Sequence, residues 1–191
     1  AAETDGPCFS HWSGGRNKQP ISKVDSFTKT LSDLPGLEPA VAFLKFCYVD
    51  FNPDTNVKEL FTYYRGAMDE LEERHSRTEF LHVTVPLTIR PEGPKEKLYR
   101  LMGRQVWADA SNEQRRRFND ELKRRYGEER VFDLATVEST GPDGEAFSDY
   151  SLHPSYTDDG GHLNERGQRI AARAMIEFLA RTMPGVRIGS H

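Results

Sequence analysis

The sequence predicts an α/β fold of three layers, in which helices cover both faces of a mainly parallel sheet. The main evidence is the order of the patterns, because apolar runs of strand length alternate along the chain with amphipathic helical patterns. The first run, VAFLKFCYV at residues 41–49, is almost unbroken, as in a strand that is buried on both faces. The 191 residues are 36% hydrophobic and fit one domain, so we expect residues 1–191 to form a single unit.

Each helix is predicted from apolar residues that recur at helical spacing. These patterns place four main helices at 23–34, 57–74, 111–126 and 165–182, with a short helix near 98–107. Ser22 with Asp25, and Ser111 with Gln114, have the spacing of a capping box, which predicts that helices begin at these two serines. Gly127 stands where a C-terminal cap belongs.

Three strands are predicted between these helices. They lie at 41–49, 79–86 and 130–134. Right-handed crossovers through the helices make the strands parallel. Functional groups in such sheets gather in the loops at the carboxyl ends of the strands. The sequence places three loops there, at 49–56, 87–97 and 135–163.

Charge and hydropathy bear on the partners of the chain. The net charge of −4 argues against a general nucleic-acid binder, and the basic run 115–117 is typical of a solvated helix face. No apolar run has the roughly 20 residues of a membrane span. The first residues do not form a signal peptide, and they are equally compatible with a soluble chain exported after cleavage, so localisation stays open. The two cysteines, Cys8 and Cys47, do not decide whether a disulfide forms, and they do not have the spacing of a zinc site.

The most informative stretch is YTDDGGHLNERG at residues 156–167. Asp159 and His162 share one glycine turn directly before the last helix. A histidine that activates a serine needs a carboxylate to fix its tautomer and orientation, and this turn supplies both groups. The alternative is that Asp159 or Asn164 only caps the helix, with His162 exposed to solvent.

This stretch resembles the last sequence block of the SGNH (GDSL-type) hydrolases, which is D-G-x-H-L-N followed by a glycine and an apolar helix. The matching residues are Asp159, Gly160, His162, Leu163, Asn164 and Gly167. Residues 41–88 and 118–134 also resemble that superfamily, so the likeness covers 22–182. It implies an SGNH/flavodoxin-like fold and a serine ester hydrolase of the esterase, lipase or carbohydrate deacetylase type. It implies no metal and no cofactor.

The resemblance also implies roles for single residues. His162 would be the general base and then the acid, and Asp159 its orienting carboxylate. Gly15, with Gly14 beside it in HWSGG, matches the glycine that contributes an oxyanion-hole N–H. Asp50 ends the segment that matches the third block, where this chain has Val49 in place of the oxyanion asparagine.

The nucleophile is the main departure from the superfamily. No G-D-S motif occurs, and Ser13 in FSHWSGG is only a weak candidate, since no apolar strand precedes it. We therefore expect the serine to lie upstream of residue 1, together with a first strand and helix. A strand position beside 41–48 would then be vacant, or filled by another segment or a partner chain.

Two other functions remain open at this stage. The first is a catalytically inactive SGNH-like domain that binds a ligand or partner. The second is a divalent-metal site formed by Asp50, Asp159 and His162. For the hydrolase, the expected substrate is a small-molecule, lipid or acylated carbohydrate ester.

Overall fold

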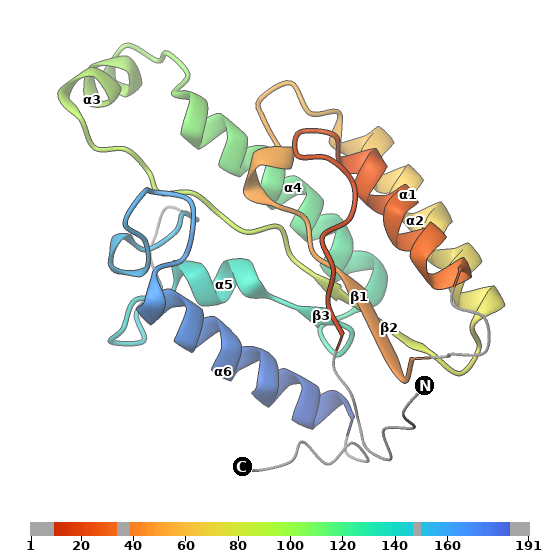
Figure 1. Ribbon diagram of the computed structural model, residues 1–191. Coiled ribbons are helices and arrows are strands. Elements are labelled where there is room, and N and C mark those ends of the chain that lie inside the picture. The colour runs from red at the N-terminus through yellow and green to blue at the C-terminus, as the bar shows by residue number, and fades with distance from the viewer. Residues whose placement is uncertain (1–9, 34–38, 147–149, 184–191) are drawn as a thin grey trace.

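The computed structural model describes residues 10–33, 39–146 and 150–183, and these form a parallel sheet between two layers of helices (Figure 1). The strands are β1 (Val41–Leu44), β2 (Glu79–Val83) and β3 (Val131–Phe132). They lie in the order β1-β2-β3, and both strand pairs are parallel. The three-layer α/β/α prediction is confirmed.

The helices divide between the two faces of the sheet. One face carries α1 (Pro20–Ser32), α2 (Val57–Arg74) and α4 (Trp107–Tyr126). The other face carries α5 (Leu134–Ser139) and α6 (Glu165–Thr182). The short helix α3 (Pro94–Leu101) belongs to neither layer. Single 3₁₀ turns, η1 (Tyr48–Asp50) and η2 (Pro154–Tyr156), lie in the connections.

Successive strand residues point to opposite layers, which explains the unbroken apolar runs. In β2, Phe80 joins the core beneath α1, α2 and α4, whereas Leu81 joins the core beneath α5 and α6. Val131 and Phe132 of β3 divide in the same way. Both faces of each strand are therefore covered, as is usual for a parallel sheet.

The bounds of α2 and α6 agree with the prediction, but α1 and α4 begin earlier than their supposed capping boxes. Pro20 occupies the first turn of α1, and the Ser22 hydroxyl donates to the Gln19 carbonyl at 2.7 Å. The Ser111 hydroxyl likewise donates to the carbonyl of Trp107, at 2.8 Å, inside α4. Both serines satisfy a carbonyl one turn back, so neither marks a helix start.

Two further differences concern the connections. β1 ends at Leu44, and the apolar pattern continues because Phe46 and Phe51 pack edge-on against Phe118 of α4, with ring centroids 5.5 and 5.1 Å apart. The predicted loop after β3 contains α5, whose N-terminus is capped by Asp133. Its carboxylate accepts the N–H of Thr136 at 3.1 Å. The apolar residues that follow Leu44, such as Phe46 and Phe51, are therefore explained by their burial against α4 and not by a longer strand.

β1 forms one edge of the sheet. Within the three described ranges its backbone pairs only with β2. Trp12, in the segment before α1, stacks on Phe27 of that helix with centroids 6.2 Å apart.

Cys47 is a free thiol, and Cys8 lies outside the described residues. In the part of the chain that the structure describes, no helix is long and apolar enough to cross a membrane.

Candidate acid–base site

Asp159 and His162 form a hydrogen-bonded pair on the turn before α6. The Asp159 Oδ2 atom lies 2.6 Å from Nδ1 of His162. The other carboxylate oxygen, Oδ1, accepts the backbone N–H groups of Gly161 at 2.9 Å and His162 at 2.8 Å. Gly160 between them has a φ of +86°, a conformation that other residues rarely adopt. The turn therefore fixes the carboxylate and imidazole in one arrangement.

The electrostatics of the pair keep the carboxylate ionised. The hydrogen bond from the His162 side chain, followed by the N–H groups of His162 and Gly161, holds the pKa of Asp159 well below its usual range. An ionised carboxylate only accepts hydrogen bonds, so the imidazole Nδ1 must carry the proton that joins them. In a neutral ring Nε2 then has a free lone pair, which is the arrangement a general base needs.

Tyr48, in the 3₁₀ turn η1 that follows β1, packs against the pair. Its ring meets the His162 ring edge-on, with centroids 5.1 Å apart and an interplanar angle of 74°. A Cβ atom at Gly161 would lie 2.5 Å from Cζ of Tyr48, so the approach requires glycine. Burial, and then the Asp159 charge, raises the pKa of Tyr48. The sequence prediction missed Tyr48, although it lies inside the segment compared with the third block.

Arg115 holds Tyr48 in place from α4. Its Nη2 and Nε donate to the Tyr48 carbonyl at 2.9 and 3.2 Å, and its guanidinium lies 5.8 Å from the Tyr48 ring centroid. Only 3% of Arg115 is exposed, and burial lowers its pKa to about 10. The prediction of a solvated face therefore holds for Arg116 and Arg117, which pair with Glu113, but is wrong for Arg115.

Asp50 hydrogen-bonds to residues of three different segments of the chain. Its buried carboxylate accepts Nζ of Lys23 at 2.7 Å, the N–H of Lys18 at 2.9 Å and the N–H of Cys47 at 2.8 Å. Three donors, one of them a cation, compensate the buried charge. Asp50 thus ties the end of β1 to α1 and to the turn before it, which is a structural role.

Gly15 lies in the turn that Asp50 anchors. Its φ is +67°, and a Cβ atom there would lie 2.6 Å from backbone atoms of Lys23. A Cβ at Gly14 would lie 2.6 Å from Oγ of Ser26. Both glycines therefore permit close packing of the turn against α1, and their predicted part in an oxyanion hole stays a prediction.

The described residues show no activated serine. Ser13 is exposed, and no hydroxyl in ranges 10–33, 39–146 and 150–183 hydrogen-bonds to Nε2 of His162. Groups of three or more metal-ligating side chains are likewise absent from these ranges, so Asp50, Asp159 and His162 do not assemble as the metal alternative requires.

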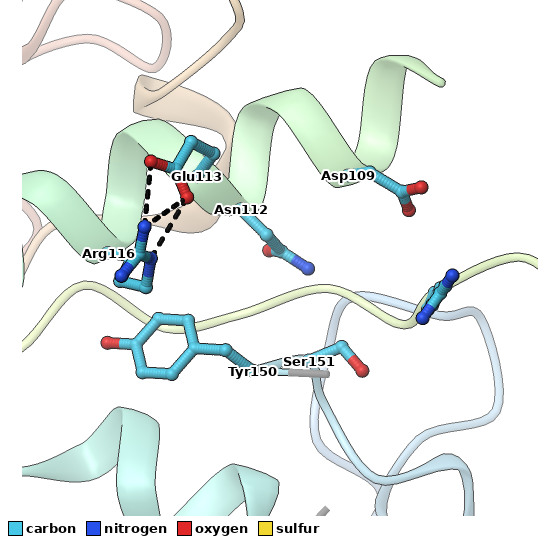
Figure 2. Close-up of a pocket in the computed structure, with 7 residues that line it drawn as sticks. Asp109, Asn112, Glu113, Arg116, Tyr150 and Ser151 are labelled. Atoms are coloured by element: carbon cyan, nitrogen blue, oxygen red, sulfur yellow. Dashed lines mark hydrogen bonds and ion pairs between the residues drawn. The ribbon is translucent and has the colours of Figure 1, made fainter. Parts of the chain in front are cut away.

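A separate hollow of about 190 Å³ lies beside α4 (Figure 2). Its lining residues are Arg90, Asp109, Asn112, Glu113, Arg116, Tyr150 and Ser151. Asn112 and Glu113 come from α4 and lie across from Tyr150 and Ser151, whereas Asp159 and His162 do not line it. The hollow is therefore distinct from the acid–base pair.

The fold is shared with solved structures of low sequence identity, whereas comparison with protein-family models and with curated sequences finds no match. An acylhydrolase, so named provisionally, from Bacteroides fragilis is 16% identical with a TM-score of 0.58, covering 85% of this chain and 72% of its own. A GDSL-like lipase from Bacteroides thetaiotaomicron is 16% identical at 0.56, covering 85% and 73%. A protein provisionally described as a platelet activating factor, from Streptococcus pneumonia, is 20% identical at 0.55, covering 83% and 69%.

Proposed function

We propose that the protein is a serine ester hydrolase of the SGNH type and that Asp159 and His162 are its acid–base pair. The observation that carries the proposal is the 2.6 Å contact between Oδ2 of Asp159 and Nδ1 of His162. The side chains of Asp159 and His162 are 56% and 68% exposed, so the imidazole is open to solvent. The fold shared with proteins named acylhydrolase and GDSL-like lipase supports the same reaction class.

The pair would act in two steps, acylation of the serine and deacylation. In the first, Nε2 of His162 takes the proton of a serine hydroxyl as its oxygen attacks the ester carbonyl, and the imidazolium then protonates the departing alcohol. In the second, His162 takes a proton from water as the water oxygen attacks the acyl-enzyme carbonyl, and the imidazolium then returns a proton to the departing serine oxygen as the acid is released. Asp159 would stabilise the imidazolium in both steps without itself becoming protonated, since its pKa is depressed.

The serine in this proposal comes from a segment outside the described residues. The edge of β1 that β2 does not occupy is where we place that segment, supplied by the same gene product or by a partner chain. The Gly15 N–H would contribute to the oxyanion hole, which gains no donor from the side chain of Val49. The substrate class proposed is a small-molecule or acylated carbohydrate ester.

Two observations favour a second candidate, a catalytically inactive domain that binds a ligand or partner. Within the described ranges Nε2 of His162 has no hydroxyl partner, and Val49 cannot stabilise an oxyanion through its side chain. In that case the Asp159–His162 turn would hydrogen-bond a ligand and carry out no chemistry. The two candidates differ in turnover, which decides between them.

Asp159→Asn provides the test, with Asp158→Asn as its matched control. Asparagine keeps a carbonyl oxygen for the N–H groups of Gly161 and His162, so the turn survives while the charge is lost. Asp158 lies in the same turn, where its side chain accepts a single hydrogen bond from within the described residues, donated by the side-chain amide of Asn164 at 3.2 Å. We expect kcat for p-nitrophenyl acetate, measured in the full-length gene product, to fall at least about 100-fold in Asp159→Asn.

Asp158→Asn and Ser13→Ala should retain the parent activity. Hydrolysis that persists unchanged in Asp159→Asn would reject the acid–base assignment. Absence of turnover in the full-length parent, together with saturable ester binding, would favour the inactive domain. Activity that a chelator removes and a divalent ion restores would reject a metal-independent mechanism.

A further inference from the structure

Helix α3 and the residues up to Trp107 form an excursion that projects from the body of the molecule (Figure 1). None of the residues of α3 is buried, whereas every other helix has at least one buried residue. The excursion is nevertheless anchored, because Arg100 donates to both carboxylate oxygens of Asp109 in α4, at 2.7 and 2.9 Å. The residues 94–107 therefore present a fixed surface to the exterior, called here the α3 surface.

The α3 surface is apolar on one side. The described residues include eight exposed large hydrophobic side chains, and four of them lie in the ten residues 98–107 of this surface. They are Leu98, Leu101, Met102 and Trp107, which are 52%, 85%, 57% and 65% exposed. Leu98, Leu101 and Met102 have the spacing i, i+3 and i+4, so they share one face of the helix. A concentrated apolar face of this kind indicates a partner that covers it.

The α3 surface is also basic, in contrast to the chain as a whole. Residues 95–104 contain four basic side chains and one acidic one, whereas the whole chain has a net charge of −4. Lys97 and Arg100 are paired with Glu92 and Asp109, so the positive charge of the surface is carried mainly by Lys95 and Arg104. Lys95 and Arg104 both lie over the ring of Tyr99, at 5.5 and 5.9 Å from its centroid. The positive charge is thus gathered beside the exposed apolar side chains.

We infer that the α3 surface docks on an anionic lipid bilayer. Apolar and aromatic side chains that insert at the interface, flanked by lysine and arginine, are the features that bind a helix in the plane of an anionic membrane. A symmetric contact between two copies is disfavoured, because it would bring Lys95 and Arg104 of one copy close to the same cations of the other. The inference goes beyond the proposed function and holds whether or not His162 acts as a base.

Tryptophan fluorescence tests the docking directly. The chain has two tryptophans, and Trp12→Phe leaves Trp107 as the sole reporter while a phenyl ring still stacks on Phe27. We expect vesicles of phosphatidylcholine and phosphatidylglycerol to shift the Trp107 emission to the blue, and brominated lipid to quench it. Vesicles of phosphatidylcholine alone should bind far less, and salt should weaken binding to the anionic vesicles.

Paired variants separate the α3 surface from other exposed residues. Leu101→Ser should lower the affinity for anionic vesicles about tenfold or more, because an inserted leucine side chain is lost. Ile176→Ser, at a position 51% exposed on α6, is the matched control and should change nothing. Lys95→Glu should also weaken binding about tenfold, since it reverses one charge and lowers the net charge of the surface by two units, whereas Lys58→Glu on α2 should not.

Three outcomes would overturn the inference. The first is failure of anionic vesicles to sediment the protein or shift the Trp107 emission. The second is an equal loss of binding in Leu101→Ser and Ile176→Ser. The third is a dimer, seen by light scattering without vesicles, that Leu101→Ser dissociates, because a second copy would then cover the surface. His162→Ala should bind vesicles like the parent, so a failed hydrolase assignment and a failed docking surface give different results.

Discussion

Two histidines of this protein occupy opposite environments. His82 in β2 is fully buried, its Nδ1 lies 2.7 Å from the Tyr64 hydroxyl, and its ring stacks on Tyr126 with centroids 3.5 Å apart. His162 is largely exposed on a turn and bonded to the carboxylate of Asp159. The partners of His82 come from α2 and α4, whereas the hydrogen-bond partner of His162 is three residues away in the sequence.

The contrast shows what each environment does to an imidazole. Burial, followed by the charges of Arg130 and Arg125, lowers the pKa of His82 to about 3, so the ring stays neutral and acts as a packing group. Asp159 has a depressed pKa and stays ionised, so it can stabilise a proton on His162. His82 thus serves the fold because long-range packing excludes water from it, whereas a local turn leaves His162 exposed and paired with a carboxylate.

The largest expected effect is on catalysis. If His162 is the base, His162→Ala should lower kcat for aryl esters by roughly 10³-fold or more in the full-length gene product, because no group then accepts the serine proton. His82→Asn should retain most of the activity at a temperature where it is folded. The comparison fails if the two variants lose activity equally, as judged by steady-state kinetics.

The next effect is on stability. His82→Ala should lower the free energy of unfolding by about 3 kcal/mol, because it leaves a cavity between Tyr64 and Tyr126 and a buried hydroxyl without its partner. His75→Ala, at the half-buried end of α2, is the control and should cost about 1 kcal/mol or less. Urea unfolding measures both, and similar losses would show that His82 has no special packing role.

A third effect concerns the pH dependence of stability, to which His82 and Glu138 contribute with opposite signs. His82 is protonated more readily in the unfolded chain, so its contribution to stability is present above about pH 6.5 and is lost as the pH falls toward 3. Burial raises the pKa of Glu138 to about 7, so its contribution is present below about pH 4.5 and is lost as the pH rises toward 7. Between about pH 4.5 and 6.5 the two slopes should largely cancel.

Single substitutions should reveal each of the two opposing pH dependences of the free energy of unfolding. Glu138→Gln keeps an acceptor for the Leu87 N–H and should leave stability rising with pH in this window, by up to roughly 1.4 kcal/mol per pH unit. His82→Asn should leave stability falling with pH. Urea unfolding at several pH values checks both signs, and parallel pH profiles for the two variants would contradict the assignment.

The smallest expected effect is that of His162 on stability. His162→Ala and Asp159→Asn should each leave the midpoint of urea unfolding nearly unchanged, because both side chains are exposed. A fall in the unfolding midpoint as large as that of His82→Ala would show that the pair holds the fold together, which would remove its contrast with His82.

The sequence by itself determined the features that depend on local spacing. The bounds of α2 and α6 follow from apolar residues one helical turn apart, and Asp159 reaches His162 because three residues and a glycine turn suffice. The parallel sheet also follows, since alternating strands and helices allow few other arrangements.

Only the tertiary structure decided which polar residues are buried and what they hold. Arg115 stands in a basic run like its two neighbours, yet it alone is buried, because the turn of the helix directs it toward the Tyr48 carbonyl. Asp50 is a structural anchor because Lys18 and Lys23, distant in sequence, converge on it. Such contacts arise from where whole elements pack, and the pattern along a single segment does not contain that information.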